Sequence, residues 1–143
     1  MTAEARSGGP TVGDVVAVAE FRAALRRFLR QSERVARHSG LTPQRYTLLL
    51  MIKGAPNGRE ESTVTELAER LQLAQSTVTE LVSRAEEAGL VEREQSQKDA
   101  RVAHLRLTEE GERRLMQSFT ELAKERDQVR EAFEHLEHAI PEI

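Results

Sequence analysis

The sequence predicts a mostly helical protein that carries one small pair of β-strands. Aromatic residues make up only 3% of the chain and charged residues 31%, which suits helices packed by aliphatic side chains better than a β-sandwich. Apolar residues recur at helical spacing in both the first and the last part of the chain. Between these parts, two short helical patterns precede two alternating segments that flank a polar stretch. This order predicts a helix-turn-helix followed by a β wing, with a long helix on either side.

Size and charge set the limits of function. At 143 residues the chain is long enough for a single domain with its own core. The formal charge of −3 excludes a uniformly basic surface, but DNA binding depends on where the basic residues lie. The absence of cysteine removes disulfides and thiolate metal sites. No apolar run approaches the length of a membrane span and no signal core begins the chain, so we expect no membrane partner and a cytoplasmic protein.

The first part of the chain predicts a tail and a long helix. Residues 1–13 are small, polar and rich in glycine, and we expect a disordered tail. A helix is predicted over about residues 14–38, and Gly40 suits the left-handed position that follows a helix. One face of this helix is apolar, with Val15, Val18, Phe21, Leu25, Phe28, Leu29, Ser32 and Val35. The other face is basic, with Arg22, Arg26, Arg27, Arg30, Arg34 and Arg37.

The central segment, about residues 42–108, begins with two helical patterns. Thr42-Pro43 starts a helix, because Thr is a good N-cap and Pro is tolerated in the first turn. Residues 54–62 are expected to form a loop. Thr63 and Glu66 then have the spacing of a capping box, which predicts the start of a short helix.

The helix after the turn at residues 73–76 is predicted to be a DNA-recognition helix. Its inward positions are apolar, whereas its outward face begins with small hydrogen-bonding side chains that can reach base edges in the major groove. A solvated helix face is the plainer alternative, and the short helix that precedes it at the right spacing favours DNA. The candidate DNA-binding residues of this helix are Gln75, Ser76, Thr77, Thr79, Glu80, Ser83 and Arg84.

A hairpin is predicted next, because residues 90–94 and 102–107 alternate apolar and polar side chains. Lys98, Asp99 and Arg101 lie at its polar tip and complete the set of candidate DNA-binding residues. An arginine there can reach the narrow minor groove. Asp99 can hold the Arg101 guanidinium or tie the loop by an Asx-type hydrogen bond. A loop ion pair of little consequence is the alternative.

A heptad pattern predicts one continuous helix from about residue 109 to residue 139. Arg126 interrupts the apolar series and marks a candidate bend or a cross-interface ion pair. A seam this far from the wing favours a dimer interface over single-chain core. The apolar positions of the seam are Leu115, Phe119, Leu122, Val129, Phe133, Leu136 and Ile140.

This combination resembles the MarR family of winged helix-turn-helix transcriptional regulators, from about Phe21 to Phe119. The resemblance implies a single domain over residues 14–143 that forms a homodimer through its first and last helices. It also implies a repressor of a palindromic operator on double-stranded DNA, with Arg101 in the minor groove and with release by a small, often aromatic, anionic ligand. The motifs that carry the resemblance are Asp99-Ala-Arg101, Leu105-Arg-Leu-Thr-Glu-Glu-Gly111, Leu67-Ala-Glu-Arg-Leu71 and Ser76-Thr-Val-Thr-Glu-Leu-Val82.

Three features depart from the family pattern. Ala74 stands where the family often has a capping residue. The absence of a capping side chain lowers the stability by about 1 kcal/mol unless Gln75 or Ser76 takes over the role. Glu80 would repel phosphates, so we expect it to face a cytosine amine or Arg84. The family usually has two C-terminal helices, whereas the heptad predicts one.

Other chemistry finds little support in the sequence. We expect no enzyme, because no nucleophile elbow, phosphate loop or metalloprotease motif is present. No cofactor or metal is expected either; His135 and His138 have metal-capable spacing, but an exposed polar face is the favoured interpretation. A winged-helix module that binds protein instead of DNA is the second hypothesis.

A small-molecule effector site is a further hypothesis, at the junction between the dimer helices and the DNA reader. The charge of Arg45 and the ring of Tyr46 could hold an aromatic carboxylate. A packed junction without a cavity is an equal alternative. The candidate ligand-binding residues are His38, Arg45, Tyr46 and Met51.

Overall fold

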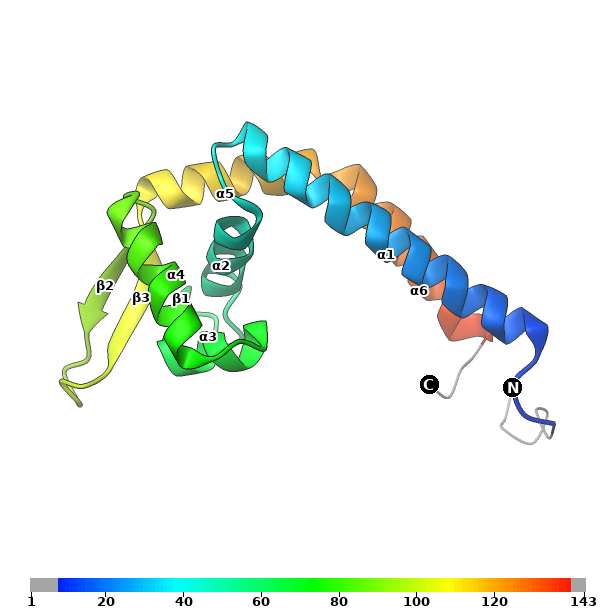
Figure 1. The fold of residues 1–143 in the computed structure, drawn as a ribbon, viewed down its shortest axis with the longest axis horizontal. Coiled ribbons are helices and arrows are strands. Elements are labelled where there is room, and N and C mark those ends of the chain that lie inside the picture. The colour runs from blue at the N-terminus through cyan, green and yellow to red at the C-terminus, as the bar shows by residue number, and fades with distance from the viewer. Residues whose placement is uncertain (1–7, 140–143) are drawn as a thin grey trace. The chain divides into compact units, whose positions relative to one another are not determined.

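The computed structural model describes residues 8–139, so residues 1–7 of the predicted tail and the heptad position Ile140 lie outside the described part. The chain forms two compact units (Figure 1). We call residues up to Arg34 together with those from Glu121 onward the two-helix unit, and Val35–Thr120 the winged unit. None of the helices within residues 8–139 combines the length and the hydropathy that a membrane span requires.

The two-helix unit contains most of α1 (Val12–His38) and α6 (Ala123–Ala139). Helix α1 begins two residues before the predicted start, because Thr11 and Asp14 cap it reciprocally. The Thr11 amide donates to Asp14 Oδ2 over 2.8 Å and the Asp14 amide donates to Thr11 Oγ1 over 3.2 Å. The rings of Phe21 and Phe133 join the two helices, with centroids 6.0 Å apart.

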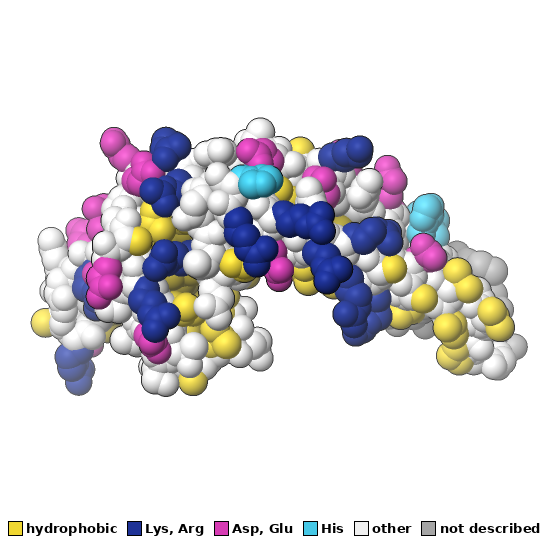
Figure 2. Space-filling model, turned by 45° about the horizontal axis from the view of Figure 1, so that its top comes forward, with side chains coloured by type: hydrophobic (Ala, Val, Ile, Leu, Met, Phe, Trp, Pro, Cys, Tyr) yellow, Lys and Arg dark blue, Asp and Glu magenta, His cyan; other side chains and the backbone are white. Residues whose placement is uncertain are grey.

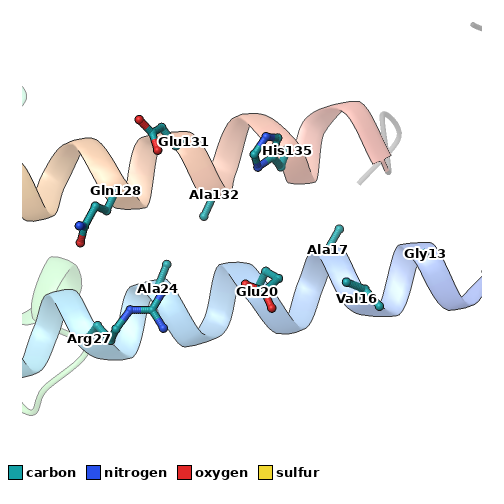
Figure 3. Close-up of a pocket in the computed structure, with 10 residues that line it drawn as sticks. All are labelled: Gly13, Val16, Ala17, Glu20, Ala24, Arg27, Gln128, Glu131, Ala132 and His135. Carbon is teal, nitrogen blue, oxygen red and sulfur yellow. The ribbon is translucent and has the colours of Figure 1, made fainter.

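A groove of about 570 Å³ runs between α1 and α6. Ala17 and Ala24 on α1 and Ala132 on α6 point into the space between the helices, as Figure 3 shows. Longer polar side chains, including Glu20 and Gln128, lie along its rim. Because the facing side chains are small, they do not fill the space between the two helices.

The winged unit holds a bundle of helices and a small sheet. Its helices are α2 (Pro43–Lys53), α3 (Val64–Leu71), α4 (Gln75–Glu87) and α5 (Glu109–Glu121). The N-caps expected at Thr42 and Thr63 are both confirmed: Thr42 Oγ1 accepts from the Arg45 amide over 3.1 Å, and Thr63 and Glu66 form a full capping box.

The sheet is antiparallel, has three strands in the order β1-β3-β2, and contains the predicted hairpin. Its strands are β1 (Glu61–Ser62), β2 (Val91–Gln95) and β3 (Ala103–Leu107). The prediction of a loop through residue 62 was wrong at its end, where Glu61 pairs with Arg106 and Ser62 with Leu105. Two residues are too few to show an alternating pattern, so only the pairing with β3 identifies this strand.

The core of the winged unit is aliphatic. Its fully buried side chains come from each of the helices and from the strands, which fixes the outward face of α4 by burying the opposite one. Leu41 and Tyr46 are also buried, at 2% and 7% exposure. The largest fully buried apolar side chains are Leu48, Leu49, Ile52, Leu67, Val78, Val82, Leu90, Leu105 and Leu115.

Polar contacts join α5 to α2 and to the end of α1. Lys53 pairs with Glu112 and, over 3.1 Å, with Glu60, and the hydrogen bond that Lys53 donates to Glu112 is the main reason why the pKa of Lys53 is raised. Within the core, Ser118 Oγ donates to Ser39 Oγ over 2.7 Å. These contacts hold the start of α5 in place beside the sheet.

The prediction of one continuous C-terminal helix was wrong. Helix α5 ends at Glu121 and α6 begins at Ala123, with Leu122 in a turn between them. Arg126 does not mark the break, since its amide donates to Leu122 O over 3.0 Å. A heptad pattern reports which side chains face inward, and it continues across a one-residue turn because the spacing is nearly kept. The supposed departure from the two-helix family pattern therefore disappears.

Glu110 offers a test by pH. Its carboxylate accepts from Arg113 Nη2 over 2.5 Å and from Arg114 Nε over 2.7 Å, and these hydrogen bonds lower its pKa to about 2. A lowered pKa stabilises the fold above the ordinary value near 4.5 and loses that effect as the pH falls through 2. We expect Glu110→Gln to lower stability at neutral pH, with the difference from wild type vanishing near pH 2. Urea unfolding across this range measures it; a pH-independent difference would contradict the assignment.

Candidate nucleic-acid interface

Helix α4 presents the outward face that was predicted for it. Val78, Val82 and Ala85 are buried, which directs the opposite face to solvent. Every candidate DNA-binding residue of the helix is exposed, namely Gln75, Ser76, Thr77, Thr79, Glu80, Ser83 and Arg84. Their contact with DNA remains a prediction.

Glu80 pairs with Arg84 on the surface of α4. Arg84 Nη2 lies 2.7 Å from Glu80 Oε1, and both side chains are more than half exposed. Of the two partners expected for Glu80, the free protein therefore uses Arg84. An exposed i,i+4 pair contributes little to stability, so it can open at low cost when another partner approaches. Meanwhile it neutralises a carboxylate that would otherwise repel phosphates.

The tip of the wing is held in one conformation by Asp99. Its Oδ1 accepts from the Arg101 amide over 3.0 Å and from Arg101 Nε over 3.2 Å. Both roles considered for Asp99 are therefore present together, and the backbone hydrogen bond, followed by the side-chain bond, lowers its pKa. The Arg101 side chain is 90% exposed. Lys98 is also exposed, and its amide donates to Ser96 Oγ over 3.2 Å.

A pair that the sequence analysis missed ties the wing to α4. Arg93 on β2 binds the Glu86 carboxylate of α4 through two nitrogens, at 2.6 and 3.3 Å. The hydrogen bond to Glu86 raises the pKa of Arg93. A two-pronged contact of this kind fixes orientation as well as distance. Opposite charges at the end of the recognition helix and in the first wing strand were the only signal in the sequence.

Comparison with known proteins points to one family. Residues 39–102 match the sequence model of the MarR family. The uncharacterised HTH-type transcriptional regulator YsmB of Bacillus subtilis (strain 168) is 36% identical over 74 residues, which cover 52% of this chain and 49% of YsmB. The middle of the chain therefore resembles MarR-family proteins. The match spans about half the length of this curated relative.

Solved structures of MarR-family regulators have a fold similar to that of this chain. AbsC from Streptomyces coelicolor has a TM-score of 0.67 at 22% identity, with 82% of each chain covered. Sco3205 from the same organism, solved in complex with DNA, has a TM-score of 0.60 at 26% identity, covering 86% of this chain and 74% of that one. The predicted fold class, mostly α with a small β wing in a winged helix-turn-helix, is confirmed.

Ala74 leaves helix α4 without a side-chain cap. Its backbone has the extended N-cap conformation, with φ −65° and ψ 147°, but no side-chain hydrogen bond caps the helix. Neither Gln75 nor Ser76 takes over the role. The first amides of α4 are therefore available to solvent or to an anion.

A cap at position 74 is expected to stabilise the protein. Ala74→Ser and Ala74→Asp should each raise the free energy of unfolding by about 1 kcal/mol, because a side-chain oxygen would satisfy an α4 amide. Thermal unfolding measures this gain. Only the aspartate should also weaken binding to duplex DNA, since its charge would lie beside phosphates. A loss of stability in both variants would show that the N-cap geometry is unsuitable.

The candidate ligand-binding residues lie in different surroundings. His38 is exposed, Tyr46 is buried, and the Met51 carbonyl accepts from Arg70 Nη1 over 2.9 Å. A cavity of about 260 Å³ lies beside α2, α3 and α4. It is lined by Pro43, Gln44, Thr47, Leu71, Leu73 and Leu81. An effector site at the four predicted residues, Arg45 included, remains a prediction.

The two histidines near the C-terminus lie in different surroundings from each other. His135 lies on the groove between α1 and α6, and His138 Nδ1 lies 2.8 Å from Glu134 O. Within the described part of the chain, no group of three or more His, Cys, Asp or Glu side chains could hold a metal ion.

Proposed function

We propose that this protein is a sequence-specific DNA-binding transcriptional regulator of the MarR family, acting as a homodimeric repressor on a palindromic operator. The observation that carries the proposal is the pairing of two exposed elements on one compact unit. The polar face of α4 is built for base edges, and the wing presents Arg101 in a conformation held by Asp99. The Glu86–Arg93 contact fixes one element to the other.

Recognition of DNA would combine two kinds of contact. Ser, Thr and Gln side chains at the start of α4 are short enough to approach base edges in the major groove, where each base pair presents a distinct pattern. Arg101, held on the hairpin, suits the minor groove or the phosphates that border it. DNA-bound relatives such as Sco3205 share this fold and support the same use here.

Exposed apolar side chains on the two-helix unit support a homodimer. Leu25 and Leu29 on α1 are 36% and 53% exposed, and Phe133 on α6 is 45% exposed. An apolar cleft of about 400 Å³, lined in part by Phe21, Leu25 and Phe133, lies between the two helices. Contiguous apolar surface of this kind on a small protein marks an interaction site. A second copy, related by a two-fold axis, would cover it.

Repression and release by a small aromatic or anionic ligand are proposed from the family resemblance. The apolar cavity beside α2, α3 and α4 adds a second candidate position for such an effector, because Leu73 and Leu81 adjoin or belong to the recognition helix. A regulator of transcription must share a compartment with the genome, which agrees with the cytoplasmic location expected from the sequence.

Selection of binding sites from random duplex DNA tests this function. We expect the purified protein to enrich a palindrome whose half-sites lie about one helical turn apart. Sedimentation equilibrium of the free protein should give a dimer. If no duplex is enriched at physiological salt, the protein-interaction alternative replaces the DNA-binding function.

A further inference from the structure

Four arginines of α1 form a row along one side of the helix. These residues, Arg22, Arg26, Arg30 and Arg34, are four positions apart, so each lies about one helical turn after the one before it. At a rise of about 1.5 Å per residue the row extends over about 18 Å. Like charges at this spacing destabilise a helix, and three such pairs follow in succession. The row is therefore unfavourable for the isolated helix.

Nothing in the described part of the chain compensates for this repulsion. All four side chains are exposed, and none of them forms an ion pair or hydrogen bond with another described residue. Glu33 has helical spacing to Arg30, yet no ion pair joins them. Several arginines elsewhere are neutralised, as Arg113 is by Glu110 and Arg130 by Asp127. Figure 2 shows basic side chains gathered in a band along the two-helix unit.

We propose that this arginine row binds phosphates of the DNA backbone, as a second, sequence-independent contact in addition to the winged unit. The inference rests on the proposed function. Guanidinium groups bind phosphate oxygens in a two-pronged geometry. Their spacing along the helix, about 6 Å per step, is comparable to the axial rise of about 7 Å over two phosphates of one strand of a duplex. A polyanion of this spacing can neutralise the whole row at once.

A second copy of the chain is a less suitable partner for the arginine row than the DNA backbone. If the row lay on a two-fold axis it would face itself and be repelled. The apolar side chains proposed for the dimer are centred on another part of α1: at 100° per residue, Leu25 is about 120° and Leu29 about 80° from the middle of the row. A dimer formed through Leu25 and Phe133 leaves the row free for another partner.

The test compares two double variants that remove equal charge. Arg26→Gln with Arg30→Gln alters the row, whereas Arg113→Gln with Lys124→Gln alters exposed basic side chains outside both the row and the apolar cleft. The probes are a duplex that carries the site selected by the protein and extends beyond it on both sides, and a duplex of equal length with unrelated sequence. Affinity is measured by fluorescence anisotropy over a series of salt concentrations. Circular dichroism checks that the helices persist.

We expect the row variant to bind both duplexes about tenfold or more weakly, with an unchanged ratio between them. Its plot of log affinity against log salt should become shallower by about 0.9 for each arginine lost per subunit. The control should keep the wild-type slope. A row variant with the slope of the control overturns the inference, and so does weaker self-association in sedimentation at an unchanged slope. If Arg101→Ala no longer binds the selected site whereas the row variant binds it as the wild type does, the inference about the arginine row fails and the proposed function stands. Absence of binding to any duplex overturns both proposals.

Discussion

Gly111→Ala is expected to destabilise the winged unit by about 2–3 kcal/mol, near the upper end for added methyl groups in a packed protein. A Cβ at this position would lie 2.1 Å from Leu90 O and 3.0 Å from Leu90 C. These are backbone atoms, so no rotamer change removes the clash. Leu90 O also accepts from the Thr108 amide over 3.0 Å, and Thr108 Oγ1 donates to Gly89 O. Relief of the clash must therefore separate the start of α5 from the entry to the wing.

Urea unfolding measures this loss, and Gly13→Ala is the matched control. In α1 the added methyl group would meet nothing closer than Thr11 Oγ1 at 3.5 Å. Alanine is the better helix former, so the control should be neutral or more stable by up to about 1 kcal/mol. We also expect Gly111→Ala to lower DNA affinity, because the wing would lose its fixed position. Wild-type stability in this variant would show that α5 can shift without cost.

Arg101→Ala is expected to weaken binding to the selected duplex by about 1–3 kcal/mol, or roughly fivefold to 150-fold. The side chain is 90% exposed, and within residues 8–139 it pairs only with Asp99 on the same loop. Its removal therefore costs the free protein almost nothing. The loss should appear in affinity and in the salt dependence, with an unchanged unfolding midpoint.

Two further variants separate charge from geometry at this position. Arg101→Lys keeps the charge but loses the planar fork, and should recover only part of the affinity. Asp99→Asn keeps an oxygen for the Arg101 amide but removes the ion pair, so a smaller loss is expected. Arg113→Ala, which also breaks an exposed ion pair, serves as the control for loss of positive charge. Equal affinity of Arg101→Ala and this control would contradict a role for the wing.

Features that depend on a few neighbouring residues were predictable from the sequence. The capping box of Thr63 and Glu66, the outward face of α4, the hairpin and the Asp99–Arg101 contact all arise within a short segment. The capping box of Thr11 and Asp14 is equally local and could also have been predicted. The glycine-rich composition before it led instead to the expectation of a tail. The residues of the candidate interface on α4 and the wing could thus be predicted from the sequence alone.

The sequence by itself determined the order of the helices, the wing and the polar face of the recognition helix, because turn chemistry and periodicity act over one or two turns of chain. Only the tertiary structure decided the rest. The strand at Glu61–Ser62 exists through pairing with β3, and the break at Leu122 leaves the heptad spacing almost intact. The Glu86–Arg93 tie joins separate elements. Each depends on contacts between segments that local patterns do not record, and these contacts fix where α4 and the wing stand relative to one another.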